Sequence, residues 1–181
     1  MGPITIVSGC PGSGKTTLAR ELAARSARGL HLESDTFYRF PAEPLDPTSA
    51  AAHAQNTSIM RALGRAAGAF AEDDYAVFLD GVIGPWFLPV LVRELPAGSA
   101  IEYVVLRVEL ARALERVRAR QGRGASATVE HVHRALAQSS VPERCVLDTS
   151  RLSPSEVLEE CLAHRARGDF RLLREALAVP R

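Results

Sequence analysis

A glycine-rich stretch near the start of the chain, SGCPGSGKTT, comes directly after the apolar run ITIV. Its residues Gly9, Gly14, Lys15 and Thr16 satisfy the pattern G-x-x-x-x-G-K-[ST], with a predicted strand over Ile4–Gly9 before it and a predicted helix after it. Glycines allow backbone conformations closed to other residues, so successive N–H groups can face inward around a phosphate. The stretch therefore predicts a phosphate-binding loop between a buried strand and a helix.

We expect this loop to bind the phosphates of ATP, aided by the partial positive charge of the helix N-terminus behind it. Lys15 is the only lysine beside 21 arginines, and a compact ammonium suits a position between terminal phosphates better than a planar guanidinium does. Lys15 is thus a candidate catalytic residue, and Thr16 is expected to offer its hydroxyl to Mg²⁺. The candidate nucleotide-binding residues of the loop are Gly9, Cys10, Pro11, Gly12, Ser13, Gly14, Lys15, Thr16 and Thr17. The alternative is a glycine-rich turn that carries Lys-Thr by chance.

Apolar runs alternate with helical patterns along the rest of the chain. Further strands are predicted over residues 29–34, 75–81, 100–108 and 144–150. Helices are predicted over residues 15–27, 48–70, 85–94, 109–120, 128–138, 153–167 and 170–178. Strands alternating with helices in this way predict an α/β fold, in which a parallel sheet carries helices on both faces, in a single domain over residues 1–181.

In such sheets ligands bind beyond the carboxyl ends of the strands. Asp35 follows the second predicted strand, where its carboxylate could accept the proton of a substrate hydroxyl that attacks the γ-phosphate. Asp35 is therefore the candidate catalytic base, and its neighbours Phe37, Tyr38 and Arg39 are candidate substrate-binding residues. The alternative role for Asp35 is to cap the turn into the next segment.

Asp80 ends the apolar strand YAVFLD, as a carboxylate delivered to Mg²⁺ would. Asp80 and Thr16 are therefore the candidate metal ligands. The residues that follow, GVIGPWF, combine aromatic side chains with glycines that let the backbone approach a ligand. Gly81 and Trp86 are candidate substrate-binding residues, and the alternative for Trp86 is that it joins the core.

The arginine-rich segment LARALERVRARQGRG places Arg112, Arg116, Arg120 and Arg123 along one face of a predicted helix, beside two glycines. This pattern predicts a mobile lid over residues 116–127 that closes on an anion. Arg116, Arg120 and Arg123 are candidate nucleotide-binding residues, and Arg120 is also a candidate catalytic group that neutralises charge on the transferring phosphoryl group. The alternative is an ordinary solvated helix face in an arginine-rich chain.

The segment after the last predicted strand is expected to contribute to the nucleotide site. Ser150 and Leu152 are candidates to frame the adenine, and Ser153 opens the pattern S-P-S-E of a capped helix. His131 and His133 lack metal-ligand spacing and are expected at the surface.

Composition bounds the partners and the compartment. The formal net charge of +1 gives no indication of nucleic-acid binding, and no apolar run is long enough for a membrane span. The three scattered cysteines suggest reduced thiols, and Met1 leads directly into a core strand with no room for a signal peptide. We therefore expect a cytoplasmic protein that is a monomer or a homodimer and whose partners are ATP and a small-molecule acceptor.

Taken together, the motifs GCPGSGKTT, ESDTFYRF, FLDGVIGPWF, RVRARQGRG and VLDTSRLSPSE give a chain that resembles the small P-loop kinases. This family includes chloramphenicol phosphotransferase, gluconate kinase, shikimate kinase and the zeta-toxin kinases. The resemblance implies a three-layer P-loop NTPase fold of the nucleoside-monophosphate-kinase type with strand order 2-3-1-4-5, and it matches Asp35 to the catalytic acid of the antibiotic and toxin kinases. The chain departs from shikimate kinase in lacking Asp-x-Asp after the second strand, and from adenylate kinases in lacking paired acceptor-binding arginines.

The sequence thus predicts an ATP- and Mg²⁺-dependent kinase that phosphorylates a hydroxyl of a small molecule, such as an antibiotic, a sugar or a nucleotide-sugar. One alternative is a nucleotide-binding switch or accessory ATPase that acts through a protein partner, and another is a polynucleotide kinase. A kinase needs a concave acceptor site between Asp35, Tyr38, the helix near residues 50–70 and Trp86, whereas a switch could do without one.

Overall fold

The computed structural model describes residues 1–121 and 126–174, and its centre is a five-stranded sheet in the order β2-β3-β1-β4-β5. All four strand pairs are parallel. The strands are β1 (Ile4–Gly9), β2 (Gly29–Glu33), β3 (Ala76–Gly81), β4 (Ile101–Arg107) and β5 (Val146–Asp148). The predicted fold class and strand order are confirmed.

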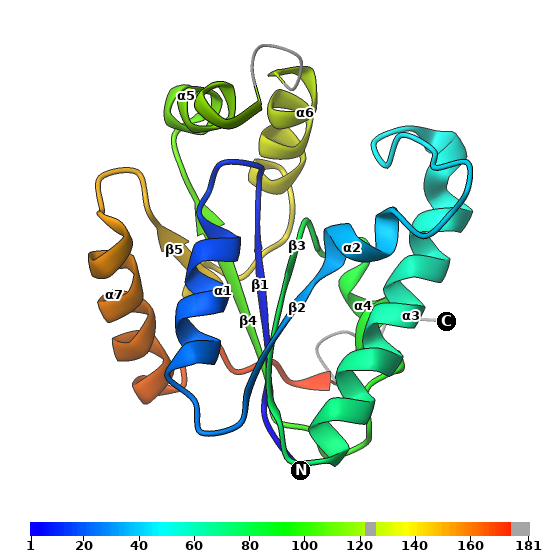
Figure 1. Cartoon of the computed structure of the whole chain (residues 1–181). Coiled ribbons are helices and arrows are strands. Elements are labelled where there is room, and N and C mark those ends of the chain that lie inside the picture. The colour runs from blue at the N-terminus through cyan, green and yellow to red at the C-terminus, as the bar shows by residue number, and fades with distance from the viewer. Residues whose placement is uncertain (122–125, 175–181) are drawn as a thin grey trace.

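Helices cover both faces of this sheet, and two of them stand above its carboxyl edge (Figure 1). Helices α1 and α7 lie on one face and α3 and α4 on the other, while α5 and α6 lie at the edge where β1 ends. The helices are α1 (Lys15–Ala24), α2 (Ser34–Tyr38), α3 (His53–Glu72), α4 (Leu88–Arg93), α5 (Leu110–Gln121), α6 (Ser126–Ala137) and α7 (Pro154–Arg167). Short 3₁₀ turns, η1 (Ala50–Ala52) and η3 (Glu143–Cys145), precede α3 and β5. No helix in the described ranges is long and apolar enough to cross a bilayer.

The central strand β1 is buried along its whole length, and its alternating side chains enter two separate cores. Ile4 and Ile6 pack with α3 and α4, whereas Val7 packs with α1 and α7. A strand buried on both faces is near-continuously apolar, which is why the pattern of ITIV identified it. The position of β1 fixes the loop that follows it at the middle of the sheet edge.

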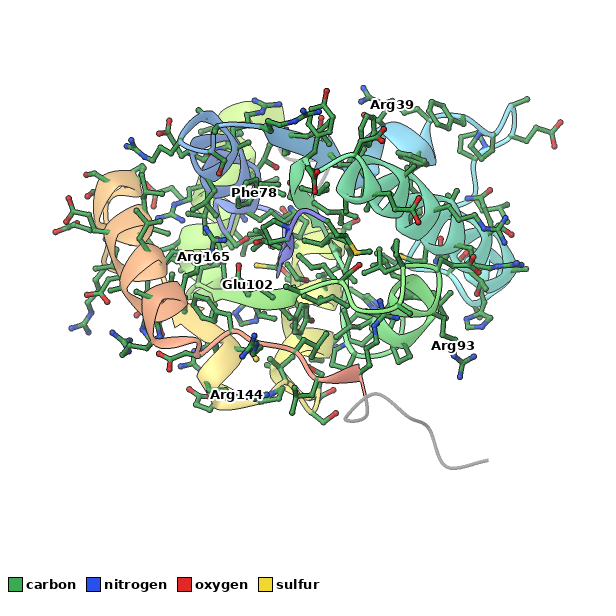
Figure 2. The ribbon with its side chains drawn as sticks, turned by 90° about the horizontal axis from the view of Figure 1, so that it is seen from below. Arg39, Phe78, Arg93, Glu102, Arg144 and Arg165 are labelled. Carbon is green, nitrogen blue, oxygen red and sulfur yellow. The ribbon has the colours of Figure 1, made fainter. Side chains whose placement is uncertain are left out.

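A partly buried ion pair joins α7 to the sheet. Glu102 on β4 accepts hydrogen bonds from Thr5 Oγ1 and from Arg165 Nε, each at 2.7 Å. The guanidinium of Arg165 also lies 5.4 Å from the ring centroid of Phe78 (Figure 2). These contacts hold α7 against the face of the sheet that it shares with α1.

The helix predicted over residues 170–178 is wrong where the structure describes it. Tyr103 N donates to the carbonyl of Phe170, and Leu172 N donates to the carbonyl of Ile101, both at 2.9 Å. Strand β5 pairs only with the last three residues of β4, so the first half of β4 would otherwise have an open edge. Because an unpaired edge is costly inside a fold, this tertiary pairing overrides the local helical pattern. Residues 175–178 of the predicted helix lie outside the described residues.

Three smaller differences concern element boundaries. The segment after β2 forms the short helix α2, which the sequence analysis did not predict. The helix predicted from residue 48 begins with η1, and the side chain of Ser49 makes no capping bond there. Strand β5 is shorter than predicted because η3 occupies the residues before it.

Candidate active site

The glycine-rich loop adopts a conformation that requires its glycines. Gly12 and Gly14 have φ angles of 84° and 97°, in the left-handed region, and Gly14 is the N-cap residue of α1. A Cβ atom at Gly12 would lie 2.6 Å from the carbonyl oxygen of Ala113 on α5. The loop therefore combines turned backbone, a helix N-terminus and close packing against α5, which is the arrangement that binds phosphate groups.

Side chains from other elements hold the loop from behind. Thr149 Oγ1 lies 3.3 Å from the carbonyl oxygen of Ser13, and Arg116 Nη1 on α5 donates to the carbonyl of Gly12 at 3.2 Å. Cys10 is buried, and this burial raises the pKa of its thiol, although the positive charges of Lys15 and Arg116 act in the opposite direction. Cys10 and Ser13 are therefore packed parts of the loop, while Arg116 reaches the loop backbone directly.

Thr16 and Asp80 meet at the carboxyl edge of the sheet. Thr16 Oγ1 donates to Asp80 Oδ2 at 2.5 Å, and Asp80 is 2% exposed. The other carboxylate oxygen, Oδ1, lies 2.6 Å from His31 Nε2 on β2. A hydroxyl and a carboxylate converging beside a phosphate-binding loop form an oxygen donor set that fits Mg²⁺.

His31 was missed by the sequence analysis. In the sheet it pairs with Phe78, so its side chain lies on the same face as Phe78 and Asp80. The alternation in GLHLE gave a weak signal that His31 is a site residue. His31 lies on the same face of the strand as Glu33, whereas the two leucines lie on the other face.

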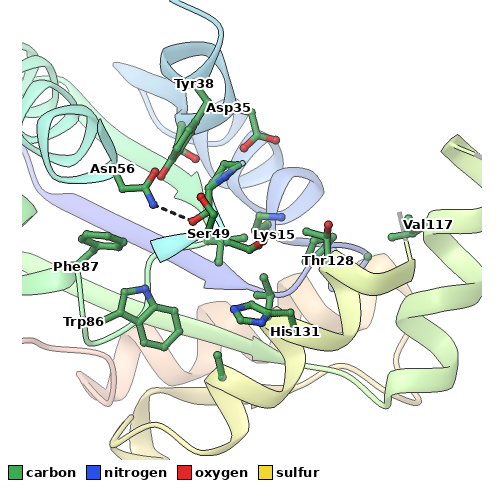
Figure 3. A pocket seen from close by; sticks show the side chains of 18 of the residues that line it. Lys15, Asp35, Tyr38, Ser49, Asn56, Trp86, Phe87, Val117, Thr128 and His131 are labelled. Atoms are coloured by element: carbon green, nitrogen blue, oxygen red, sulfur yellow. Dashed lines mark hydrogen bonds between the residues drawn. The ribbon is translucent and has the colours of Figure 1, made fainter. Parts of the chain in front are cut away.

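A cavity of about 930 Å³ opens beyond the ends of β1, β2 and β3 and includes Lys15 and Thr16 (Figure 3). Figure 3 shows Lys15 between an aromatic side, with Trp86 and Phe87, and a side formed by Thr128 and Val117. Its described lining residues are Pro11, Gly12, Lys15, Thr16, Glu33, Ser34, Asp35, Tyr38, Pro47, Thr48, Ser49, Ala50, His53, Asn56, Val82, Trp86, Phe87, Val117, Arg120, Thr128, His131, Val132 and Ala135.

Asp35 and Tyr38 enter this cavity from α2. Asp35 is exposed and lies in the first turn of α2, whose N-cap is Glu33 and has no side-chain capping bond. The alternative that Asp35 caps this turn is therefore wrong. Burial, and secondarily the negative charge of Asp35, raise the pKa of Tyr38 to about 12, so its hydroxyl keeps its proton at neutral pH.

Aromatic side chains line the opposite part of the cavity. Trp86 is 43% exposed, so the alternative that it joins the core is wrong. Its ring lies over Gly84, where a Cβ atom would come within 2.4 Å of it. The ring of Phe87 stacks on His53, with centroids 5.7 Å apart.

Other predicted substrate-binding residues lie around the cavity and do not line it. Phe37 packs against the core and against Phe40, with ring centroids 5.2 Å apart. Arg39 is exposed and donates to Thr36 Oγ1 at 3.3 Å. Gly81 is buried where a Cβ atom would lie 2.1 Å from Ser34 Oγ. Phe37 and Gly81 therefore support the walls from behind.

The predicted lid is only partly described. Arg120 lines the cavity, and Arg116 is bonded to the glycine-rich loop as above. Arg123 and its flanking glycines lie outside the described residues. Arg112 is exposed.

The predicted adenine-framing residues hold the loop after β5. Ser150 Oγ accepts a hydrogen bond from Glu109 N at 3.0 Å, and Leu152 packs against the core between the sheet and α7. Neither lines the cavity, and neither does Thr17, which is exposed on α1. Of the two histidines expected at the surface, His131 is exposed but lines the cavity, and His133 is half-buried with Nε2 3.0 Å from the carbonyl oxygen of Val108.

Asn56 is a further lining residue that the sequence analysis missed. It is 3% exposed on α3 and occupies the same helix face as Ile59, Met60 and Leu63. A polar residue in register with an apolar helix face was the signal that could have identified it.

Comparisons with known proteins agree with this architecture. A family model described as AAA domain matches residues 4–142, whereas a search of curated proteins gave no match. A sugar kinase from Janibacter sp. HTCC2649 superimposes with a TM-score of 0.70 at 21% identity, over 99% of this chain and 100% of that one. A gluconokinase from Sinorhizobium meliloti 1021 gives 0.69 at 20% identity, over 93% of each chain. The tunicamycin resistance protein of Deinococcus radiodurans gives 0.64 at 22% identity, over 91% of this chain and 96% of that one.

These likenesses extend over 91–99% of this chain. At such identities they show a shared fold, and the predicted resemblance to the small P-loop kinases is confirmed at that level.

Proposed function

The chain belongs to the AAA domain family, and from that premise we propose that it is an ATP- and Mg²⁺-dependent phosphotransferase acting on a hydroxyl of a small molecule. The observation that carries the proposal is the cavity that joins the glycine-rich loop to Asp35, Asn56 and Trp86. A nucleotide switch needs a phosphate site alone, whereas this cavity continues past Lys15 into a space large enough for a second ligand. A kinase is therefore favoured over a switch or an accessory ATPase.

The residues divide the reaction between them. The loop N–H groups and Lys15 would bind the β- and γ-phosphates, and Arg120 would neutralise charge that develops on the transferring group. Thr16 and Asp80 would hold Mg²⁺, which when bound neutralises phosphate charge and orients the γ-phosphate. His31 would fix the second oxygen of Asp80.

Asp35 would act as the general base. The acceptor oxygen forms a bond to the γ-phosphorus, the bond from that phosphorus to the β,γ-bridging oxygen breaks, and ADP leaves. The hydroxyl proton passes to the Asp35 carboxylate, whose exposure in the first turn of α2 suits contact with a second ligand.

The test is acceptor-dependent release of ADP across a panel of hydroxyl compounds, with Asp35→Asn as the variant. Asn keeps the shape and removes the base, so we expect ATP to bind normally while transfer falls by roughly 10²–10⁴-fold. Asp73→Asn removes a carboxylate from the C-terminal end of α3 and is the matched control. A wild-type transfer rate in Asp35→Asn would contradict its role as the base, and ADP release unaffected by every acceptor would favour the switch.

A further inference from the structure

Asn56 is a lining residue of the cavity, and one of its side-chain atoms is a buried acceptor, unpaired among the described residues. Its Nδ2 donates to the carbonyl of Pro47 at 2.9 Å (Figure 3). This bond assigns the nitrogen and the oxygen of the side-chain amide, because a carbonyl can only accept. Its Oδ1 is buried and has no hydrogen-bond partner among the residues that the structure describes. Because buried polar atoms in native proteins are nearly always bonded, this oxygen indicates a ligand that donates a hydrogen bond there.

The surroundings of Asn56 are aromatic. Trp86 and Phe87 line the same side of the cavity, and Figure 3 shows both on the Asn56 side of Lys15. The ring of His53 extends this surface by stacking on Phe87. Flat aromatic surfaces of this kind favour a ligand with an apolar ring face, while the protonated hydroxyl of Tyr38 can donate to a ligand oxygen.

The charges of the cavity are separated. Among the described lining residues, lysine and arginine are represented by Lys15 and Arg120, on the glycine-rich loop and α5. The carboxylates of Glu33 and Asp35 lie toward α2, and His53 and His131 are the other basic groups. An anionic acceptor near Asn56 would lie close to these two carboxylates. The described lysine and arginine side chains of the lining, Lys15 and Arg120, would lie on the phosphate side of the cavity, away from it.

We propose that the acceptor is an uncharged ring compound with several hydroxyls and one apolar face, as in glycosides and nucleosides, bound through Asn56 Oδ1 and the ring of Trp86. This assignment rests on the proposed phosphotransfer and narrows its substrate class. One hydroxyl donates to Asn56 Oδ1, the ring lies on Trp86, and another hydroxyl faces Asp35. Phosphorylated and carboxylated acceptors, including nucleotide-sugars, should bind more weakly, because the described lining residues place the carboxylates of Glu33 and Asp35 on the acceptor side.

Trp86 makes a binding test possible without turnover, because it is the only tryptophan in the sequence. With Mg²⁺ and ADP saturating the nucleotide site, its fluorescence is followed while matched pairs are titrated: methyl glucoside against glucuronate, and a nucleoside against its 5′-monophosphate. We expect at least one neutral class to give a saturable change, with its anionic counterpart bound at least tenfold more weakly. Which of the two neutral classes responds identifies the source of the ring.

Variants of α3 test the residue assignment. Asn56→Leu should weaken the neutral ligand at least tenfold while the affinity for ADP stays unchanged, and Ser58→Ala, on an exposed position of the same helix, should change neither. His53→Arg adds a guanidinium to the aromatic side and should strengthen the anionic members of the panel.

The outcomes separate this assignment from the phosphotransfer itself. Saturable binding of a neutral ligand with no acceptor-dependent ADP release would support the assignment and contradict the transfer. ADP release with anionic acceptors in preference to neutral ones would overturn the assignment and leave the transfer standing. Absence of any saturable response to the neutral compounds, or full affinity in Asn56→Leu, would also overturn it.

Discussion

At the scale of single residues, the position of Lys15 carries the most information. The chain uses arginine at 21 other basic positions, and Lys15 alone sits at the turn into α1 within the phosphate-binding loop. A guanidinium is larger than an ammonium and planar. The loop has little room to adjust to it, because Gly12 already packs tightly against Ala113 of α5.

We expect Lys15→Ala to abolish tight ATP binding, and Lys15→Arg to give a folded protein whose turnover is badly impaired. Calorimetric titration of ATP and the ADP-release assay measure the two effects. Arg20→Ala, five residues later on α1 and exposed, removes the same charge outside the loop and should bind ATP normally. Near-normal turnover of Lys15→Arg would show that the point charge is not required.

His31 is expected to act on the metal through Asp80. Its Nε2 lies 2.6 Å from Asp80 Oδ1, so His31→Ala frees the carboxylate to rotate away from the metal position. We expect a roughly 10–100-fold loss in Mg²⁺ affinity of the nucleotide complex, measured by titrating Mg²⁺ at fixed ATP.

Two controls separate this positioning role from a loss of packing. Nucleotide binding without Mg²⁺ should be the same in His31→Ala as in the wild type, and His31→Gln, which can still donate to Asp80, should recover part of the Mg²⁺ dependence. Equal losses with and without Mg²⁺ would point to a structural role for His31.

At the scale of elements, α7 has sequence signals for both of its ends, a capping box at the start and a glycine at the finish. Ser153 and Glu156 form a capping box, in which Glu156 N donates to Ser153 Oγ and Ser153 N donates to the Glu156 carboxylate at 2.7 Å. Hydrogen bonds to the Glu156 carboxylate, first from the side chain and then from the backbone N–H of Ser153, lower the pKa of Glu156. The helix ends at Gly168 in the left-handed conformation.

Ser153→Ala should lower the free energy of unfolding by about 1 kcal/mol at pH 7, measured by urea denaturation. Because the folded pKa of Glu156 lies below its unfolded value, the stabilisation by its carboxylate is complete above the unfolded pKa and is lost as the pH falls through the folded pKa. The difference between wild type and Glu156→Gln should therefore shrink between about pH 6 and pH 3. Glu160→Gln, on the exposed face of the same helix, should show no such trend.

The elements that could be predicted are those whose sequence signals lie within the element itself. The capping box and the apolar run of β1 are continuous in the sequence, and both were predicted. Residues 170–172 were not, because their conformation depends on the open edge of β4, about 70 residues earlier in the chain. The conformation of a segment is set by such a partner when local propensity is weak.

At the scale of the whole molecule, the proposed nucleotide site follows the central strand β1, and its cavity includes residues of α1 on one face of the sheet and of α3 on the other. Ligand that binds only the folded state stabilises it by about 2.7 kcal/mol at 100 times its Kd. For a chain of this length that corresponds to a rise in Tm of roughly 5–10 °C.

We therefore expect Mg²⁺ and ATP to raise the Tm by this amount, measured by differential scanning calorimetry. The shift should vanish in Lys15→Ala, and in Asp80→Asn it should lose its dependence on Mg²⁺. An equal shift in Lys15→Ala would place nucleotide binding away from the glycine-rich loop.

The sequence predicted the phosphate end of the candidate site better than the acceptor end. The phosphate end lies within one run of residues, so its geometry follows from the motif. The acceptor end is assembled from α2, the segment near Pro47, α3 and the residues after β3, and no pattern within one of them reveals the others. Asn56 and His31 become functional candidates only when the fold brings them beside the cavity and Asp80.

The strand order of the sheet also sets an order in time during synthesis on the ribosome. Strand β1 is made first, yet it lies between β3 and β4, which follow about 70 and 95 residues later. The first half of β4 pairs with Phe170–Leu172, and these residues are synthesised after all five strands. Until those residues leave the ribosome, the first half of β4 has an unpaired edge, so we expect the nascent chain to be most prone to aggregation in this interval.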